Sequence, residues 1–305
     1  MDSNFRAGYV AIIGKPNAGK STLLNSLLEQ KLTIATPKPQ TTRKRILGIL
    51  TEPEYQMIFL DTPGIIDPQY LLQEKMMKYV KYSVSDADII IHIIDCTSNQ
   101  EVEDAASGDF AKQYLAGKRK PTLLLINKID LAPDERVQNI VTKIEDGGNY
   151  SAILPISALT PAARTPILAF ILKHLPLGPQ YYPSDFVSDE DERFFVTEII
   201  REKILELYRE EIPYSCEVVI EDFKERKDSK HYIGALIYVE RDSQKSIIIG
   251  KGGEQIKKLG ELARTAIEEF LDHPVYLELR VKVKDNWRKS ERHLKEFGYE
   301  TGSDE

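Results

Sequence analysis

The chain has 305 residues, 42% hydrophobic and 29% charged, so it can bury the cores of about two domains. No run approaches the ~20 apolar residues that span a bilayer, and residues 1–8 lack an apolar signal region. Two cysteines cannot form a disulfide framework, which favours a cytoplasmic protein.

The net charge of −7 argues against a protein that binds nucleic acid over its whole surface. The charge is uneven, however. Residues 241–295 contain 13 Lys and Arg against 9 Asp and Glu, a local charge of +4 on a chain that is otherwise acidic. This asymmetry suggests a polyanion-binding module near the C-terminus, although charge alone would favour a solvated surface.

The first half of the chain alternates predicted strands with predicted helices. Two of the strands are continuous apolar runs, as is typical of strands buried on both faces. The alternation predicts an α/β doubly wound sheet, whose ligands lie at the carboxyl ends of the strands. The expected strands are 9–13, 44–50, 55–61, 89–95, 122–127 and 152–155, and the expected helices are 21–28, 71–84, 105–115, 134–144 and 166–174.

The second half has a different order. Three prolines and a glycine within residues 175–184 predict a semi-rigid linker. We therefore expect one domain at 1–176, a linker at 177–192 and an α+β domain at 193–305. The elements expected after the linker are a helix at 194–208, strands at 215–221 and 232–240, a short helix near 246–249, a helix at 254–271, a strand at 275–284 and a helix at 290–297.

A glycine-rich turn separates the first strand from the first helix. This context is that of a phosphate-binding loop, in which backbone N–H groups and the helix dipole hold an anion. Lys20 can reach the outer phosphates, and Ser21 can place its hydroxyl on Mg²⁺. The weaker alternative is a glycine turn with an exposed lysine. The predicted phosphate contacts are Gly14, Lys15, Pro16, Asn17, Ala18, Gly19, Lys20, Ser21 and Thr22.

The strand at 55–61 ends in Asp61-Thr62-Pro63-Gly64. The Asp61 carboxylate can hold Mg²⁺ through a water molecule, and the Gly64 N–H can meet the terminal phosphate. In isolation such a tetrapeptide is equally a surface turn. Its place after a strand, in a chain with a phosphate loop, favours contact with a nucleotide.

Residues 127–130, Asn-Lys-Ile-Asp, end another buried strand. The Asp130 carboxylate can accept hydrogen bonds from the N1–H and amino group of guanine, and adenine lacks both donors. Helix caps at Asp130 and Ser157 are alternatives that the spacing leaves open. A nucleotide kinase has no need of this motif and is disfavoured. The predicted base contacts are Asn127, Lys128, Asp130, Ser157, Ala158 and Leu159.

The polar loop 36–43 is predicted to become ordered around the third phosphate and Mg²⁺. Thr42 is our choice for a second hydroxyl ligand, and Thr41 is the alternative. The predicted metal ligands are therefore Ser21, Thr42 and Asp61. Without the other motifs, an ordinary loop would be the preferred interpretation.

These motifs, in this order, resemble those of the translation-factor-related class of GTPases. The resemblance implies that the chain binds GTP and GDP with Mg²⁺ and hydrolyses GTP slowly. Ile65 and Ile66 follow Gly64, where Ras-like proteins place a water-orienting glutamine. Asn17 matches an asparagine that ligates potassium in some relatives, and we hypothesise a potassium ion there. The catalytic candidates are Lys20, Asn17, Thr42 and Gly64.

Residues 250–253, Gly-Lys-Gly-Gly, lie between two predicted helices. Such a loop clamps a nucleic-acid backbone in KH domains, and the order of elements resembles the type II KH fold. The expected ligand is single-stranded RNA. Each apolar residue nearby could instead belong to the core. For Trp287, which follows a predicted strand, packing in the core is the preferred interpretation over stacking on a base. The predicted RNA contacts are Ile248, Ile249, Gly250, Lys251, Gly252, Gly253, Lys257, Arg280 and Lys282.

A GTPase domain followed by a KH domain resembles the Era family of bacterial GTPases over nearly the whole chain. The resemblance implies a factor in assembly of the small (30S) ribosomal subunit that binds the 3′ end of 16S ribosomal RNA. It also implies a cytoplasmic protein with peripheral association at the inner membrane, and we expect a monomer. The alternative is an RNA-binding assembly protein whose nucleotide site is mainly structural. GTP turnover that RNA stimulates would separate the two.

Overall fold

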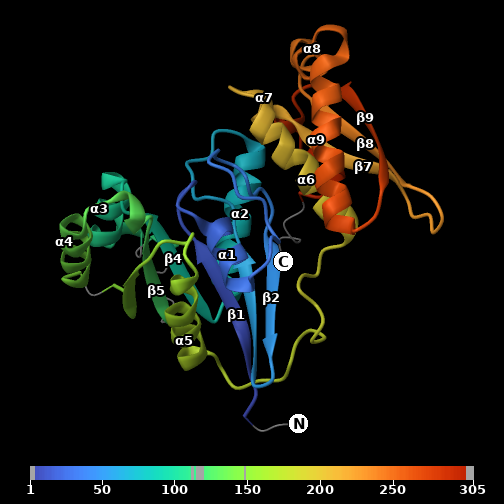
Figure 1. Cartoon of the computed structure of the whole chain (residues 1–305). Coiled ribbons are helices and arrows are strands. Elements are labelled where there is room, and N and C mark those ends of the chain that lie inside the picture. The colour runs from blue at the N-terminus through green and yellow to red at the C-terminus, as the bar shows by residue number, and fades with distance from the viewer. Residues whose placement is uncertain (1–3, 111–112, 115–119, 148, 300–305) are drawn as a thin grey trace. The chain divides into compact units, whose positions relative to one another are not determined.

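The computed structural model describes residues 4–110, 113–114, 120–147 and 149–299 and forms two compact units (Figure 1). Unit 1 comprises Met1–Asp67 and Met76–Asp189, and unit 2 comprises Pro68–Lys75 and Glu190–Glu305. The domain limits at residues 176 and 193 stay a prediction. No helix among the described residues has the length and apolar character to cross a bilayer.

Unit 1 is built on a six-stranded sheet with the order β2-β3-β1-β4-β5-β6. Every neighbouring pair is parallel except β2 and β3, which are antiparallel. The strands are β1 (Arg6–Ile13), β2 (Ile46–Glu52), β3 (Tyr55–Asp61), β4 (Ile89–Asp95), β5 (Thr122–Asn127) and β6 (Ala152–Pro155). The helices are α1 (Lys20–Leu28), α2 (Leu71–Asp86, of which residues 71–75 belong to unit 2), α3 (Asn99–Ser107), α4 (Asp134–Glu145) and α5 (Arg164–His174).

The central strands are buried on both faces, as their apolar runs predict. In β5, Leu123 and Leu125 pack into the cluster that contains residues of α1 and α5. The alternate residues Leu124 and Ile126 pack into the cluster that contains residues of α3 and α4. Because side chains alternate along a strand, one apolar run supplies both faces. The predicted α/β doubly wound fold is confirmed.

The helix predicted at residues 105–115 is interrupted at Gly108, because residues 109, 110, 113 and 114 are helical and residues 105–107 belong to the earlier helix α3. Helix α3 begins at Asn99 because the hydroxyl of Ser98 accepts the N–H of Glu101 at 3.3 Å, an N-cap bond. It ends at Ser107 because Gly108 adopts a left-handed conformation with φ of 72°. Residues 111, 112 and 115 of the predicted helix lie outside the described residues.

Unit 2 packs helices against a three-stranded sheet with the order β7-β8-β9, in which β7 and β8 are antiparallel and β8 and β9 are parallel. Its order of elements is that of the predicted KH domain. The elements are α6 (Glu192–Leu207), α7 (Ile212–Ser215), β7 (Glu217–Lys224), β8 (His231–Val239), α8 (Asp242–Ile249), η4 (Lys251–Gly253), α9 (Glu254–Leu271), β9 (Val275–Val283), η5 (Trp287–Lys289) and α10 (Glu291–Glu296).

The strand predicted at 215–221 is displaced. Ser215 belongs to the short helix α7, where its hydroxyl donates to the carbonyl of Ile212 at 2.9 Å. Pro213 stands in the first turn of that helix, where its missing N–H costs no hydrogen bond. The strand therefore begins at Glu217 and continues to Lys224.

Candidate functional site

The phosphate loop joins β1 to α1, and two of its glycines are required by sterics. A Cβ on Gly14 would lie 2.2 Å from the carbonyl oxygen of Ile93. Gly19 has φ of 106°, and a Cβ there would lie 2.2 Å from Nδ2 of Asn127. Both distances are far shorter than a Cβ can tolerate. The backbone at these two positions can therefore approach its neighbours this closely only because the residues are glycines.

Lys20 lies buried within the curve of this loop. Its Nζ donates hydrogen bonds to the carbonyls of Gly14 at 3.0 Å and Lys15 at 2.8 Å. Burial lowers the pKa of Lys20 to about 8, and the nearby carboxylate of Asp61 opposes that shift. The ammonium group is thus held where the helix dipole of α1 also favours an anion.

Three oxygen donors meet beside the loop. The Ser21 Oγ donates to Asp61 Oδ2 at 2.9 Å and lies 3.0 Å from Thr42 Oγ1, which in turn donates to Asp61 Oδ2 at 3.2 Å. Burial raises the pKa of Asp61 to about 6, against the attraction of Lys20 and the two hydroxyls. The second carboxylate oxygen, Oδ1, is buried without a hydrogen-bond partner in the part of the chain that the structure describes. A cluster of hard oxygen donors with a spare acceptor suits Mg²⁺.

Neighbouring threonines of the loop point to different partners. The hydroxyl of Thr41 lies 2.8 Å from that of Thr36 and donates to the carbonyl of Lys38 at 2.7 Å. The hydroxyl of Thr42 instead joins Ser21 and Asp61. The loop therefore places Thr42, the preferred candidate, beside Ser21 and Asp61, whereas the Thr41 hydroxyl bonds within the loop itself.

At the other end of the site, Asn127 joins two loops. Its Nδ2 donates to the carbonyl of Ala18 at 2.7 Å, and its Oδ1 accepts from the N–H of Ala158 at 2.9 Å. Lys128 pairs with Asp95 at 2.6 Å, while Asp130 is exposed on the wall of the cavity. The Asn127 side chain thus fixes the loops, and Asp130 contributes an exposed carboxylate to the lining of the cavity.

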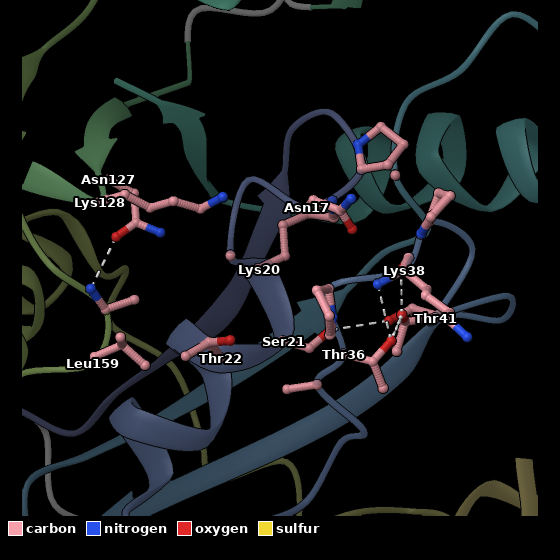
Figure 2. A pocket seen from close by; sticks show the side chains of 18 of the residues that line it. Asn17, Lys20, Ser21, Thr22, Thr36, Lys38, Thr41, Asn127, Lys128 and Leu159 are labelled. Atoms are coloured by element: carbon pink, nitrogen blue, oxygen red, sulfur yellow. Dashed lines mark hydrogen bonds between the residues drawn. The ribbon is translucent and has the colours of Figure 1, made fainter. Parts of the chain in front are cut away.

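These loops enclose a cavity of about 470 Å³, in which Lys20 and Ser21 lie between the base-site residues and the loop of Thr36 and Thr41 (Figure 2). The predicted site residues that line it are Pro16, Asn17, Gly19, Lys20, Ser21, Thr22, Thr42, Gly64, Asn127, Lys128, Asp130, Ser157, Ala158 and Leu159. Thr41, the alternative hydroxyl ligand, also lines the cavity, and the lining residues that were not singled out as contacts are Ala35, Thr36, Pro37, Lys38, Pro39, Gln40 and Leu131. The polarity of the loop signalled most of these, but nothing in the sequence marked Ala35 or Leu131.

Several predicted contacts lie behind the cavity and support it. The hydroxyl of Thr62 donates to the carbonyl of Ile12 at 2.7 Å, so it joins two strands and does not face the cavity. Lys15 pairs with Asp104 at 2.5 Å. A Cβ on Gly64 would lie 2.8 Å from Pro16, so only glycine lets these two loops touch. The predicted residues outside the lining are Gly14, Lys15, Ala18, Asp61, Thr62 and Pro63.

In unit 2, the loop between α8 and α9 is open to ligands. Gly250, Gly252 and Gly253 have φ of 74°, 61° and 83°, which L-residues rarely adopt. A Cβ on Gly252 or Gly253 would meet nothing within 4 Å, so the backbone there is accessible. Lys251 and Lys257 are exposed on the same loop and on the first turn of α9.

Three predicted RNA contacts do not share the exposed surface of this loop, and their contact with RNA stays a prediction. Ile248 is wholly buried in the core of unit 2, because it is on the face of α8 that packs inward. Arg280 and Lys282 alternate with the core residue Val281 and so lie on the sheet face opposite the helices, where both pair with Glu221.

Trp287 is packing, as expected. It is wholly buried, and its Nε1 donates to the carbonyl of Ser215 at 2.8 Å. It therefore fixes the C-terminal segment to α7 and has no face open to a base.

Comparison with known proteins covers nearly the whole chain. Residues 9–128 match the family described as 50S ribosome-binding GTPase, and residues 211–288 match the KH domain family. GTPase Era of Clostridium novyi is 43% identical over 295 residues, covering 97% of this chain and 99% of that protein. The chloroplastic GTPase ERA1 of Zea mays is 46% identical over 299 residues, covering 97% of this chain and 71% of that protein.

Solved structures agree. A variant of Era from Aquifex aeolicus, bound to GDP and AlF4−, has a TM-score of 0.90 and 40% identity over 97% of this chain and 99% of its own. A structure of Era in complex with MgGDPNP and nucleotides 1506–1542 of 16S ribosomal RNA gives the same values. The chain described here, a P-loop GTPase domain followed by a KH domain, therefore belongs to the Era family of GTPases.

Proposed function

We propose that this GTPase is a molecular switch that binds the 3′ end of 16S ribosomal RNA and acts in assembly of the small ribosomal subunit. The observation that supports a switch is that Thr42, which lies on a loop, contacts Ser21 and Asp61 beside the phosphate loop. The RNA partner is supported by the related Era structure with nucleotides 1506–1542. Such a protein would work in the cytoplasm, where ribosomal subunits assemble.

The oxygen cluster would hold Mg²⁺. We assign the hydroxyls of Ser21 and Thr42 as direct ligands and Asp61 as a ligand through water, which would give its unpaired Oδ1 a partner. When bound with GTP, Mg²⁺ neutralises charge that develops on the phosphates. Since Thr42 belongs to the loop, the occupant of the phosphate site decides whether that loop is held.

Guanine would lie at the other end of the cavity. Asp130 would accept from the base, Lys128 would cover it, and the N–H groups of residues 157–159 would face its oxygen. The pair between Lys128 and Asp95 supports this role, because it fixes the lysine beside the cavity. An adenine base would leave the Asp130 carboxylate without its donors.

Hydrolysis would depend on charge stabilisation, because Ile65 and Ile66 cannot orient water. Lys20 and the N–H of Gly64 would meet the terminal phosphate. Asn17, which lines the cavity with φ of 64°, would help to hold a potassium ion. We expect faster GTP turnover in potassium than in sodium at equal ionic strength, and equal rates would refute the role of Asn17.

The RNA would be held by the loop 250–253 and by Lys257. Exposed glycine backbone allows close approach to a strand, and the lysines supply charge. Ile249, half-buried beside the loop, would offer apolar surface. Arg280 and Lys282 are not assigned to this face.

Turnover of GTP with and without an RNA of nucleotides 1506–1542 tests the proposal. A switch should hydrolyse GTP faster when the RNA is bound. If the protein binds the RNA but its turnover is indifferent to it, the nucleotide site is mainly structural and the alternative holds.

A further inference from the structure

Helix α9 contains a glycine, Gly260, in its second turn. Glycine weakens the interior of a helix relative to alanine, because its backbone loses more conformational freedom on folding. A glycine at such a position therefore calls for a reason in packing, in backbone geometry or in the approach of a ligand.

Neither packing nor backbone geometry supplies that reason. A Cβ on Gly260 would lie 3.7 Å from Leu279 Cδ1, an ordinary contact, and would meet no other atom within 4 Å beyond its own helix turn. The backbone is helical, with no positive φ. Gly250 is different, since its φ is 74° and a Cβ there would lie 2.5 Å from Gln255. Alanine would fit the fold at residue 260.

The surroundings of Gly260 point to an anionic chain. Lys257 and Arg264 stand three residues before and four residues after it, so all three share one flank of α9. Both cations are exposed, and neither pairs or hydrogen-bonds with any residue that the structure describes. Arg280, on the far face of the sheet, is instead paired with Glu221.

We propose that Gly260 is a notch in the RNA-binding face, in which a ribose or base of single-stranded RNA packs directly on the backbone of α9. Leu279 would form the floor of the notch, and Lys257 and Arg264 would hold phosphates on either side. A strand clamped by the loop 250–253 would reach the notch, because Gly260 lies about 10 Å along the helix from Gly253. The inference rests on the proposed RNA binding.

The test is Gly260→Ala, measured by fluorescence anisotropy with a labelled RNA of nucleotides 1506–1542 and the protein loaded with GDPNP. We expect the Kd to rise at least about fivefold. The melting temperature should stay the same or rise, because alanine favours the helix. A variant that binds RNA more weakly but melts at the same or a higher temperature has a filled notch. A variant with a damaged fold would bind RNA more weakly and also melt at a lower temperature.

Two further variants sharpen the result. Gly260→Leu should weaken RNA binding more than Gly260→Ala, because it fills more of the notch. Thr265→Ala is the matched control, since Thr265 is exposed on the other side of α9 and, among the described residues, its hydroxyl bonds only the Glu261 carbonyl at 3.1 Å. Its Kd should equal that of the unchanged protein.

The outcomes are distinguishable. If the unchanged protein binds the RNA and both Gly260 variants bind it equally well, the notch is overturned while the proposed function stands. If the unchanged protein binds no RNA, the proposed function fails and the notch fails with it.

Discussion

Two buried charges face each other at the phosphate site. Burial moves the pKa of Lys20 down to about 8 and that of Asp61 up to about 6, and each charge opposes the shift of the other. A bound phosphate would favour the charged ammonium of Lys20, and a bound cation would favour the charged carboxylate of Asp61. This arrangement makes the site sensitive to pH.

The affinity of the GTP-bound protein for Mg²⁺ should fall as the pH drops through about 6, because protonated Asp61 no longer attracts a cation. Calorimetric titration with Mg²⁺ at several pH values measures this. Asp61→Asn is the control, since it should bind Mg²⁺ more weakly and retain only the pH dependence of the nucleotide itself. Equal pH dependence in both proteins would contradict the role of Asp61.

The stability of the nucleotide-free protein should show the opposite sign. Because the pKa of Asp61 is raised on folding, the folded chain binds this proton more tightly than the unfolded chain does. The contribution is fully present below the ordinary aspartate pKa of 3.8 and is lost as the pH rises through about 6. Denaturant unfolding of Asp61→Asn should lack this component between those pH values, and an unchanged profile would count against it.

Asp130 should decide the choice of base. Asp130→Asn should weaken GTP binding by about 100-fold or more, and the variant should gain affinity for xanthosine nucleotides. The reason is that the asparagine amide can donate a hydrogen bond to the base where the aspartate carboxylate can only accept one. Competition between the two nucleotides for the variant measures the change. An unaltered preference would refute the assignment of Asp130 to guanine.

At the scale of elements, the chain after α5 is attached to the strand that follows the Thr42 loop. The N–H of Ile49 donates to the carbonyl of Val187 at 2.8 Å, and the hydroxyl of Ser188 donates to the carbonyl of Leu47 at 2.8 Å. The donor Ile49 and the acceptor Leu47 both lie on β2, which begins four residues after Thr42. The predicted linker is thus partly fixed to unit 1.

Gln56, wholly buried on β3, holds the same segment. Its Oε1 accepts from the N–H groups of Tyr181 at 2.9 Å and Tyr182 at 3.0 Å, and its Nε2 donates to the Tyr182 carbonyl at 2.9 Å. Gln56→Leu should lower the free energy of unfolding of unit 1 by about 2 kcal/mol, because three part-buried backbone groups lose their hydrogen-bond partner. Amide exchange at residues 181 and 182 should accelerate, and unchanged exchange would show that other contacts hold the segment.

The sequence predicted elements well where periodicity was strong. The strands at 55–61, 89–95, 122–127 and 152–155 and the helix at 254–271 have the bounds that were expected. The start of α3 at Asn99 and its end before Gly108 were not predicted, because each depends on a single residue, the Ser98 cap and the left-handed glycine. Boundaries that a single polar bond decides are harder to predict than long apolar runs.

The direction of individual side chains was the harder problem at the site. Thr62 and Asn127 belong to the expected motifs, but their side chains bond to the carbonyls of Ile12 and Ala18. Among three consecutive isoleucines, Ile248 is wholly buried and Ile247 is 49% exposed. Only the packing of the folded chain decides which residue of such a set faces a ligand.

At the scale of the whole molecule, the basic loop of unit 2 should account for much of the salt dependence of RNA binding. Replacing Lys251 and Lys257 with alanine should lower RNA affinity and reduce the slope of log K against log salt by about 1.4, because two phosphate contacts are lost. Replacing Arg280 and Lys282 is the matched control, since both pair with Glu221 on the other sheet face. Equal losses from both pairs would show that the RNA face is wider than proposed.

The central claim is that the nucleotide in unit 1 governs how unit 2 holds RNA. The most direct measurement is the Kd of the full chain for an RNA of nucleotides 1506–1542, determined with GDPNP and then with GDP. The account predicts clearly tighter binding with GDPNP, and the same Kd with both nucleotides would contradict it.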